Sequence, residues 1–193
     1  HSHDVAASCA ISGTRPQGHQ QTVDGIHHLL AGGVDVMINL VVTTLNQDHL
    51  AAFVDWCAAT FVGLRPSLKL AFPSTVGKGG EWEGIALRYA DVMDEVRAAH
   101  AQAHAHGLAI AFEGFPNCVL GDPSVREVGR SGFGETHYLE DVHGQDLFAI
   151  RHIEAELSCY PEACQGCAAL SVCPGVLEPY ARAHGVGELV PFP

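Results

Sequence analysis

Segments with strand-like and helix-like patterns alternate along the first part of the chain. The strand-like segments begin at residues 34, 68 and 108, and one segment with helical periodicity separates each from the next. Parallel strands need a crossover connection of about a dozen residues or more, usually a helix, and such crossovers are right-handed. The alternation therefore predicts an α/β fold, either an open sheet or part of a barrel.

Three helices are predicted from apolar residues that recur every three or four positions. The first covers residues 22–31 with Thr22 as a possible N-cap, the second follows Asn46 as its N-cap, and the third covers residues 82–106 and ends at Gly107. The apolar stripe of the second helix consists of Leu50, Phe53, Val54, Cys57 and Phe61. Its cysteine is therefore expected in the core rather than in a binding site.

The predicted strands have one apolar face and one face that is polar or small. The apolar faces of the second and third strands carry Leu68, Leu70, Phe72, Leu108, Ile110 and Phe112. The opposite face does not suit the filled interior of a closed eight-stranded barrel, but it suits the lining of a ligand cavity. Candidates near the C-terminal ends of the strands are Asn39, Thr43, Ser74 and Glu113. Each is also a common residue type where a strand enters a loop.

Composition and charge narrow the class of partner. The chain has 193 residues, of which 47% are hydrophobic and 17% charged, enough apolar material for a packed core. The net charge of -12 opposes binding to nucleic acid phosphates and to anionic lipids, which favours a small-molecule or peptide substrate. No apolar run approaches the roughly 20 residues of a membrane span, and no signal-like segment is evident. We expect a cytoplasmic protein that binds neither membranes nor nucleic acids.

The pattern changes after residue 113. Glycine and proline become frequent, residues 136–150 have the pattern of a β-hairpin with its turn at His143 and Gly144, and a cysteine-rich segment follows. These features predict two regions, residues 1–113 and residues 114–193. The second is irregular and small, so we expect it to depend on a metal centre for stability.

The cysteine-rich segment has the spacing of a metal site. Cys164, Cys167 and Cys173 form C-x2-C-x5-C, and the chain has seven cysteines in total, an odd number that disfavours a framework of disulfides. Zinc and iron–sulfur clusters both accept thiolates at such spacing. The fourth ligand is either Cys118, in GFPNC, or Cys159, which forms C-x4-C-x2-C with the first two cysteines.

Five stretches of the chain carry a family resemblance. They are HSHD at residues 1–4, AGGVDVMINLVVTTLNQDHLAAFVDW at 31–56, GFPNC at 114–118, CQGCAALSVCPGV at 164–176 and PYARAHGVGELVPF at 179–192. Together they resemble the C-terminal part of a radical SAM enzyme with an auxiliary iron–sulfur module of the SPASM or twitch type. The cysteine segment is the most specific of the five.

The resemblance implies a fold, an activity and a set of ligands. Residues 1–113 would be the later βα units of a partial (β/α) barrel that binds S-adenosylmethionine and a radical-generating 4Fe-4S cluster, and residues 114–193 an auxiliary cluster module. Cys164, Cys167 and Cys173 match the auxiliary-cluster cysteines, and Cys118 matches the cysteine after the last barrel strand, so it is preferred to Cys159. Asn39 and Glu113 would lie in the cavity for S-adenosylmethionine or substrate.

One departure from the family bears on activity. The C-x3-C-x2-C motif of the radical-generating cluster and the Gly-Gly-Glu type motif are absent from these 193 residues, and both are expected before His1. The chain is therefore expected to be a fragment that lacks the N-terminal barrel segment and does not start radical chemistry by itself. The alternative hypothesis is a non-catalytic, zinc-ribbon-like binding module on an α/β scaffold.

Overall fold

The computed structural model describes residues 1–73, 87–125 and 158–193. The described chain is a mixed α/β protein that divides into two units, unit 1 from His1 to Ala111 and unit 2 from Phe112 to Pro193. The sequence-based boundary after residue 113 lies two positions further along the chain. Within the described residues no helix combines the length and the apolar character that a membrane span requires.

Unit 1 contains helices and a small parallel sheet. Its elements are α1 (Val5–Ser12), α2 (Pro16–Ala31), β1 (Met37–Val41), η1 (Gln47–His49), α3 (Leu50–Thr60), β2 (Ser67–Ala71), α4 (Tyr89–His106) and the start of β3 (Ile110–Glu113). The strand order is β1-β2-β3, and β1 and β2 are parallel with Met37 opposite Ser67 and Val41 opposite Ala71. The expectation of parallel strands joined through helices is confirmed for this pair.

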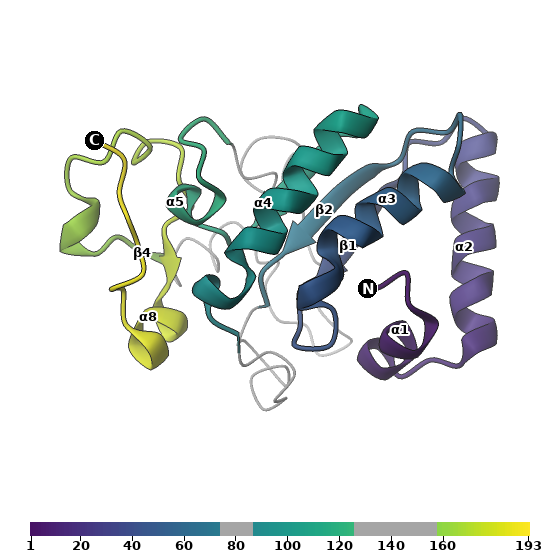
Figure 1. Ribbon diagram of the computed structural model, residues 1–193, viewed down its shortest axis with the longest axis horizontal. Coiled ribbons are helices and arrows are strands. Elements are labelled where there is room, and N and C mark those ends of the chain that lie inside the picture. The colour runs from purple at the N-terminus through teal and green to yellow at the C-terminus, as the bar shows by residue number, and fades with distance from the viewer. Residues whose placement is uncertain (74–86, 126–157) are drawn as a thin grey trace, which may run out of the picture. The chain divides into compact units, whose positions relative to one another are not determined.

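Two helices cover one face of this sheet. Helices α3 and α4 pack against each other and lie in front of β1 and β2 (Figure 1). The core beneath them contains Leu40, Leu50, Val54, Leu68, Leu70, Val92 and Val96, all with no exposed surface. The predicted stripe of α3 is confirmed, and burial raises the pKa of Cys57 to about 12.

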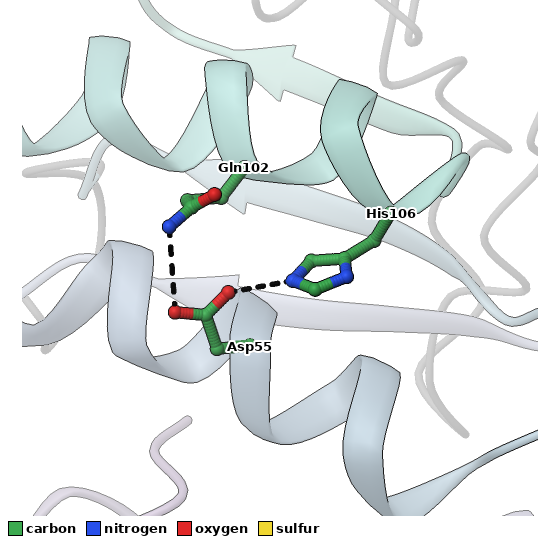
Figure 2. Close-up of polar contacts among 3 residues, drawn as sticks. All are labelled: Asp55, Gln102 and His106. Carbon is green, nitrogen blue, oxygen red and sulfur yellow. Dashed lines mark hydrogen bonds and ion pairs between the residues drawn. The ribbon is translucent and has the colours of Figure 1, made fainter.

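Polar side chains also connect α3 and α4 at the solvent-exposed edge of their interface. Asp55 of α3 pairs through Oδ1 with Nε2 of His106 at 2.7 Å, and Gln102 Nε2 donates to Asp55 Oδ2 at 3.5 Å (Figure 2). The side chains of Asp55 and His106 are 48% and 38% exposed. Solvent screens such pairs, so this contact contributes little to stability.

A carboxylate of α4 caps the beginning of α3. Oε2 of Glu95 accepts hydrogen bonds from the backbone amides of Leu50 (3.1 Å) and Ala51 (3.2 Å). The first amides of a helix have no partner within the helix, and the N-terminal end of the helix dipole favours a negative charge. Glu95 therefore fixes the position of α3 relative to α4.

The structure corrects the start of the first helical segment. Helix α2 begins at Pro16, and Thr22 lies inside it, where its Oγ1 donates to Gly18 O at 2.9 Å instead of capping the helix. Helix α1 was not predicted. Its signals are present in the sequence, because the Asp4 carboxylate accepts from Ala7 N at 2.7 Å and Gly13 ends the helix with φ 66°.

The role predicted for Asn46 is also corrected. Its side chain makes no capping bond to the helix that follows. Instead it is buried, accepts from Thr43 N at 2.7 Å, and donates from Nδ2 to His1 O (2.7 Å) and Val41 O (3.0 Å). Asn46 therefore joins the end of β1 to the N-terminal segment, and Thr43 is buried in this same turn.

The strands are displaced from their predicted limits by a few residues. β1 begins at Met37 and not at residue 34, and Val34 is 50% exposed. β2 and β3 begin at Ser67 and Ile110 instead of 68 and 108, and of the predicted apolar face of β3 only Phe112 is buried. Helix α4 ends at Gly107 as predicted, with φ 65°, but Leu87 and Arg88 are not helical, so α4 begins at Tyr89 and not within a continuous helix from residue 82. Residues 82–86 and Ser74 lie outside the described residues.

Unit 2 contains short elements. They are α5 (Asn117–Leu120), β4 (Ser158–Cys159), η4 (Glu162–Cys164), β5 (Val176–Leu177) and α8 (Glu178–His184). β4 and β5 pair in antiparallel fashion, Ser158 with Leu177 and Cys159 with Val176. The hairpin predicted at residues 136–150 lies outside the described residues.

Candidate metal centre

Four cysteines of unit 2 line one pocket. They are Cys118, Cys164, Cys167 and Cys173, and the hollow they share has about 360 Å³ of empty space, part of it open to solvent. All seven cysteines of the chain are free thiols. The remaining wall is mostly apolar and includes Ala169, Leu170, Val176, Leu189 and Pro191. The structure thus brings together the four residues that the sequence analysis preferred as ligands.

A chain of tight turns positions the three cysteines of the C-x2-C-x5-C segment. Cys164 N donates to Pro161 O at 2.8 Å, Cys167 N to Cys164 O at 3.1 Å and Cys173 N to Ala169 O at 2.8 Å. Gly166, between the first two cysteines, has φ 81°, a left-handed conformation that glycine adopts without strain. These turns direct the thiols to a common hollow.

Cys118 enters the pocket from α5. The preceding residue, Asn117, is buried and donates from Nδ2 to the carbonyl oxygens of Asp122 (3.2 Å), Pro123 (3.3 Å) and Val125 (2.7 Å). The backbone amide of Asn117 also lies 3.5 Å from Cys173 Sγ. Asn117 therefore connects α5 to the loop that follows and to the thiol of Cys173.

The segment after Cys173 is closely fitted. Gly175 N points at Cys173 Sγ from 3.5 Å, and Tyr160 OH donates to Cys173 O at 3.0 Å. Gly175 has φ 82°, and a Cβ there would lie 2.9 Å from Cys159 O and 3.1 Å from the ring of Tyr160. Only glycine fits this position without displacing a neighbour.

The last residues of the sequence form another wall. Leu189 and Pro191 line the pocket, and Ala168 N donates to Phe192 O at 3.3 Å. Neither these residues nor Asn117 and Tyr160 were predicted as site residues from the sequence. Three of them could have been found from the sequence motifs. Asn117 precedes the cysteine of GFPNC, and Leu189 and Pro191 lie in the C-terminal motif GELVPF.

The surroundings of Cys118 and Cys164 disfavour the ionisation of these two thiols. Burial, opposed by the amide of Val190 and reinforced by Cys173 and Cys164, raises the pKa of Cys118. Burial also raises the pKa of Cys164, and repulsion from Cys173, Cys167 and Cys159 adds to the effect. Thiolates crowded in this way need positive charge among them, which a bound metal centre provides.

Cys159 lies beside the pocket but is not part of its lining. It belongs to β4, and its pKa is raised first by burial and then by repulsion from Glu178. Its charge acts on Cys164, so the two side chains are near each other. The geometry therefore places Cys118, and not Cys159, in the same pocket as the three cysteines of the C-x2-C-x5-C segment.

The four thiols line one pocket but do not form a ready-made metal site. Among the described residues, no group of three or more His, Cys, Asp and Glu side chains is arranged to hold a metal ion. A tetrahedral zinc site requires its sulfurs at about 2.3 Å from one atom, whereas each iron of a 4Fe-4S cluster takes its own thiolate. Thiolates serve as ligands in both kinds of site, so the donor types are compatible with either.

The two residues proposed for S-adenosylmethionine or substrate lie elsewhere. Asn39 is exposed on β1 of unit 1, opposite Lys69, and Glu113 is half-buried at the end of β3 in unit 2. Neither lines the cysteine pocket. Comparison of the chain with models of protein families, with curated proteins and with solved structures finds no match.

Proposed function

We propose that this chain is the C-terminal portion of a radical SAM enzyme and that Cys118, Cys164, Cys167 and Cys173 hold an auxiliary 4Fe-4S cluster. A bound cluster of this kind would bind substrate or transfer electrons. The enzyme's S-adenosylmethionine and its radical-generating cluster would be bound mainly by the barrel segment that precedes His1. The substrate would be a small molecule or a peptide, consistent with the charge of -12.

The observation that carries the proposal is the common pocket of four thiols. Cys118 is separated from the other three by more than forty residues of sequence, yet all four line the same hollow. Closing a long loop costs only slightly more free energy than closing a short one, so the sequence separation is no obstacle. Cysteines with unrelated structural roles would not be expected to line the same pocket.

One further observation supports a cluster over a single zinc ion. The backbone amides of Asn117 and Gly175 each lie 3.5 Å from Cys173 Sγ. Hydrogen bonds to the sulfurs tune the reduction potentials of iron–sulfur clusters. The exposure of Asn39 on the polar face of β1 agrees with the proposed lumen of a partial barrel.

The decisive measurement is the metal content of the chain purified without oxygen and reconstituted with iron and sulfide. We expect about four irons and four acid-labile sulfides per chain, with the absorption and EPR spectra of a 4Fe-4S centre. Stoichiometric zinc without sulfide would refute the cluster and favour the zinc-ribbon-like module.

Single cysteine variants identify the ligands. Cys118→Ala should lose most of the bound iron, whereas Cys159→Ala should retain it, because only Cys118 lines the pocket. Cys9→Ala, in α1 of unit 1, controls for the general effect of removing a thiol. Retention of the cluster in Cys118→Ala together with its loss in Cys159→Ala would reverse the assignment.

The radical SAM assignment has a separate test. These 193 residues contain no C-x3-C-x2-C motif, so the reconstituted chain should not cleave S-adenosylmethionine in the presence of dithionite. The parent protein, which includes the residues before His1, should cleave it. Cleavage by the isolated chain, or none by the parent, would contradict the proposal.

A further inference from the structure

The chain turns back from α8 to the cysteine pocket. α8 ends at Gly185, and a hydrogen bond from Leu189 N to Val186 O at 3.2 Å closes the turn that follows. Leu189 is 7% exposed and lines the pocket, as does Pro191. Residues 186–192, the return segment, therefore form a wall of the pocket that contains the cysteines.

Hydrogen bonds hold the return segment at both ends. Near its beginning, Tyr180 OH of α8 donates to Oε1 of Glu188. At its end, Phe192 O accepts from Ala168 N of the C-x2-C-x5-C segment at 3.3 Å. Tyr180 is 5% exposed, and a buried phenol needs a hydrogen-bond partner, so its bond to a carboxylate is a strong one. Residues 189–191 lie between the two attachment points.

Val190 directs its side chain to solvent and its backbone amide to the pocket. The side chain is 75% exposed, in contrast to that of the neighbouring Leu189. Burial raises the pKa of Cys118, and a hydrogen bond from the Val190 amide opposes this rise. The contribution of Val190 to the site is therefore its backbone N–H and not its side chain.

An amide directed at a ligand sulfur would affect the chemistry of a bound cluster. Reduction adds negative charge to the cluster, and an N–H group that points at a sulfur stabilises this charge. Hydrogen bonds to the sulfurs are accordingly among the features that set the reduction potential. The amide of Val190 can contribute only while the return segment is held against the pocket.

We propose that the hydrogen bond from Tyr180 to Glu188 positions the return segment at the pocket. In that position the backbone amide of Val190 reaches the sulfur of Cys118 and raises the reduction potential of the bound cluster. Neither Tyr180 nor Glu188 lines the pocket, so both are positioning residues that act through the backbone. The effect on the potential rests on the proposed function, whereas the placement of the Val190 amide does not.

Tyr180→Phe removes the hydroxyl group and keeps the buried ring. In the reconstituted chain, we expect this variant to retain its iron and sulfide but to be reduced at a more negative potential than the wild type. A potentiometric titration followed by EPR measures the shift. An unaltered potential would overturn the proposal. Loss of the cluster would also overturn it, because Tyr180 would then support the fold as a whole.

Hydrogen–deuterium exchange tests the positioning step separately. Read by mass spectrometry with fragmentation to single residues, it works with iron, with zinc or without a metal. In Tyr180→Phe the Val190 amide should exchange at least ~10-fold faster, whereas the Cys173 amide, bonded to Ala169 O at 2.8 Å, should be unchanged. Equal acceleration at both amides, or at neither, would refute positioning by Tyr180.

The same samples separate this proposal from the proposed function. If the Val190 amide responds to Tyr180→Phe but the chain binds zinc without sulfide, the proposed function fails together with the effect on the potential. The positioning of the return segment would then stand by itself. If iron and sulfide bind but the Val190 amide does not respond, the proposed function stands and the positioning fails.

Two variants of Glu188 form a matched pair. Glu188→Gln keeps an oxygen that accepts from Tyr180 OH, so the Val190 amide should retain its slow exchange. Glu188→Ala removes the acceptor and should behave like Tyr180→Phe. Equal exchange of the Val190 amide in the two Glu188 variants would show that this hydrogen bond does not position the return segment.

The amide of Val190 can also be changed without its side chain. An ester in place of this amide, introduced by ligation of a synthetic segment that begins at Cys173, should shift the potential in the same direction as Tyr180→Phe. Val190→Ala is the control, because it keeps the N–H and shortens only an exposed side chain, and its potential should equal that of the wild type. Tyr180→Phe should add no further shift in the ester-containing chain, because both changes act through one hydrogen bond. Additive shifts would overturn the proposal.

Discussion

At the scale of single residues, Gly175 is the position where the site tolerates least change. It has φ 82°, and an added Cβ would lie 2.9 Å from Cys159 O. We expect Gly175→Ala to reduce the free energy of unfolding by roughly 2–5 kcal/mol, from left-handed strain and overpacking together, and to lower the cluster content. Thermal unfolding and iron analysis of the purified variant measure both effects.

Gly166 provides the matched control for this substitution. Its φ is 81°, but a Cβ there would have nothing within 4 Å. Gly166→Ala should therefore cost only the backbone strain, roughly 1–2 kcal/mol. If the two variants lost the same free energy of unfolding, the close approach of Cys159 and Tyr160 to position 175 would not contribute to the effect.

His3 makes the stability of unit 1 depend on pH. Burial, followed by repulsion from His49 and opposed by Asp4, lowers the pKa of His3 from its ordinary 6.5. The unfolded chain therefore binds this proton more tightly than the folded chain, and the free energy of unfolding should fall as the pH drops below 6.5. Above that pH the contribution is constant.

Denaturant unfolding at about pH 7.5 and about pH 5.5 measures this dependence. His3→Gln should reduce the loss of stability between the two pH values. His104→Gln, at an exposed position of α4, is the control and should leave the loss unchanged. A His3→Gln variant with the same loss as the wild type would exclude His3 as the cause.

At the scale of elements, the interface between α3 and α4 contains one strong and one weak polar interaction. Glu95 caps two amides of α3, so Glu95→Ala should reduce the free energy of unfolding by roughly 1–2 kcal/mol. Asp55→Ala removes the exposed contact to His106 and should cost roughly 0.5 kcal/mol or less. Chemical denaturation of the two variants tests the order, and a larger loss in Asp55→Ala would contradict it.

The elements of unit 1 were predictable from the sequence wherever burial sets the pattern. The stripe of α3 and the strand cores Leu68 and Leu70 are buried as expected, because apolar periodicity records which side chains leave water. Helix ends were predicted less well, since capping side chains have alternative partners. Thr22 bonds back to Gly18, and Asn46 bonds to the N-terminal segment. The apolar periodicity of a sequence does not indicate which hydrogen-bond partner a capping side chain takes.

At the scale of the whole molecule, the chain divides into two compact units, and removal of the proposed cluster should affect them differently. Unit 2 has short elements and, in its described residues, no disulfide, so a bound cluster would supply much of its stability. Removing iron with a chelator should accelerate amide exchange at Val176 and Tyr180 but not at the buried Val54 and Val92 of unit 1. Uniform acceleration in both units would contradict this.

The candidate site was predictable only in part from the sequence. The C-x2-C-x5-C spacing indicates three ligands because nearby thiols on successive turns share a hollow without help from the rest of the fold. Spacing left Cys118 and Cys159 as equal candidates, and the family resemblance favoured the former. The structure places Cys118 in the lining through α5 and the bonds of Asn117. Such long-range placement depends on tertiary packing, which no local pattern encodes.

The wall formed by Leu189 and Pro191 has a consequence for air sensitivity. These two apolar side chains line the pocket beside the four cysteines, and Ala168 N donates to Phe192 O next to them. Apolar surroundings of a metal site limit the access of solvent to it. If the proposed cluster is bound in this pocket, the wall would therefore shield it on that side from oxidants dissolved in water.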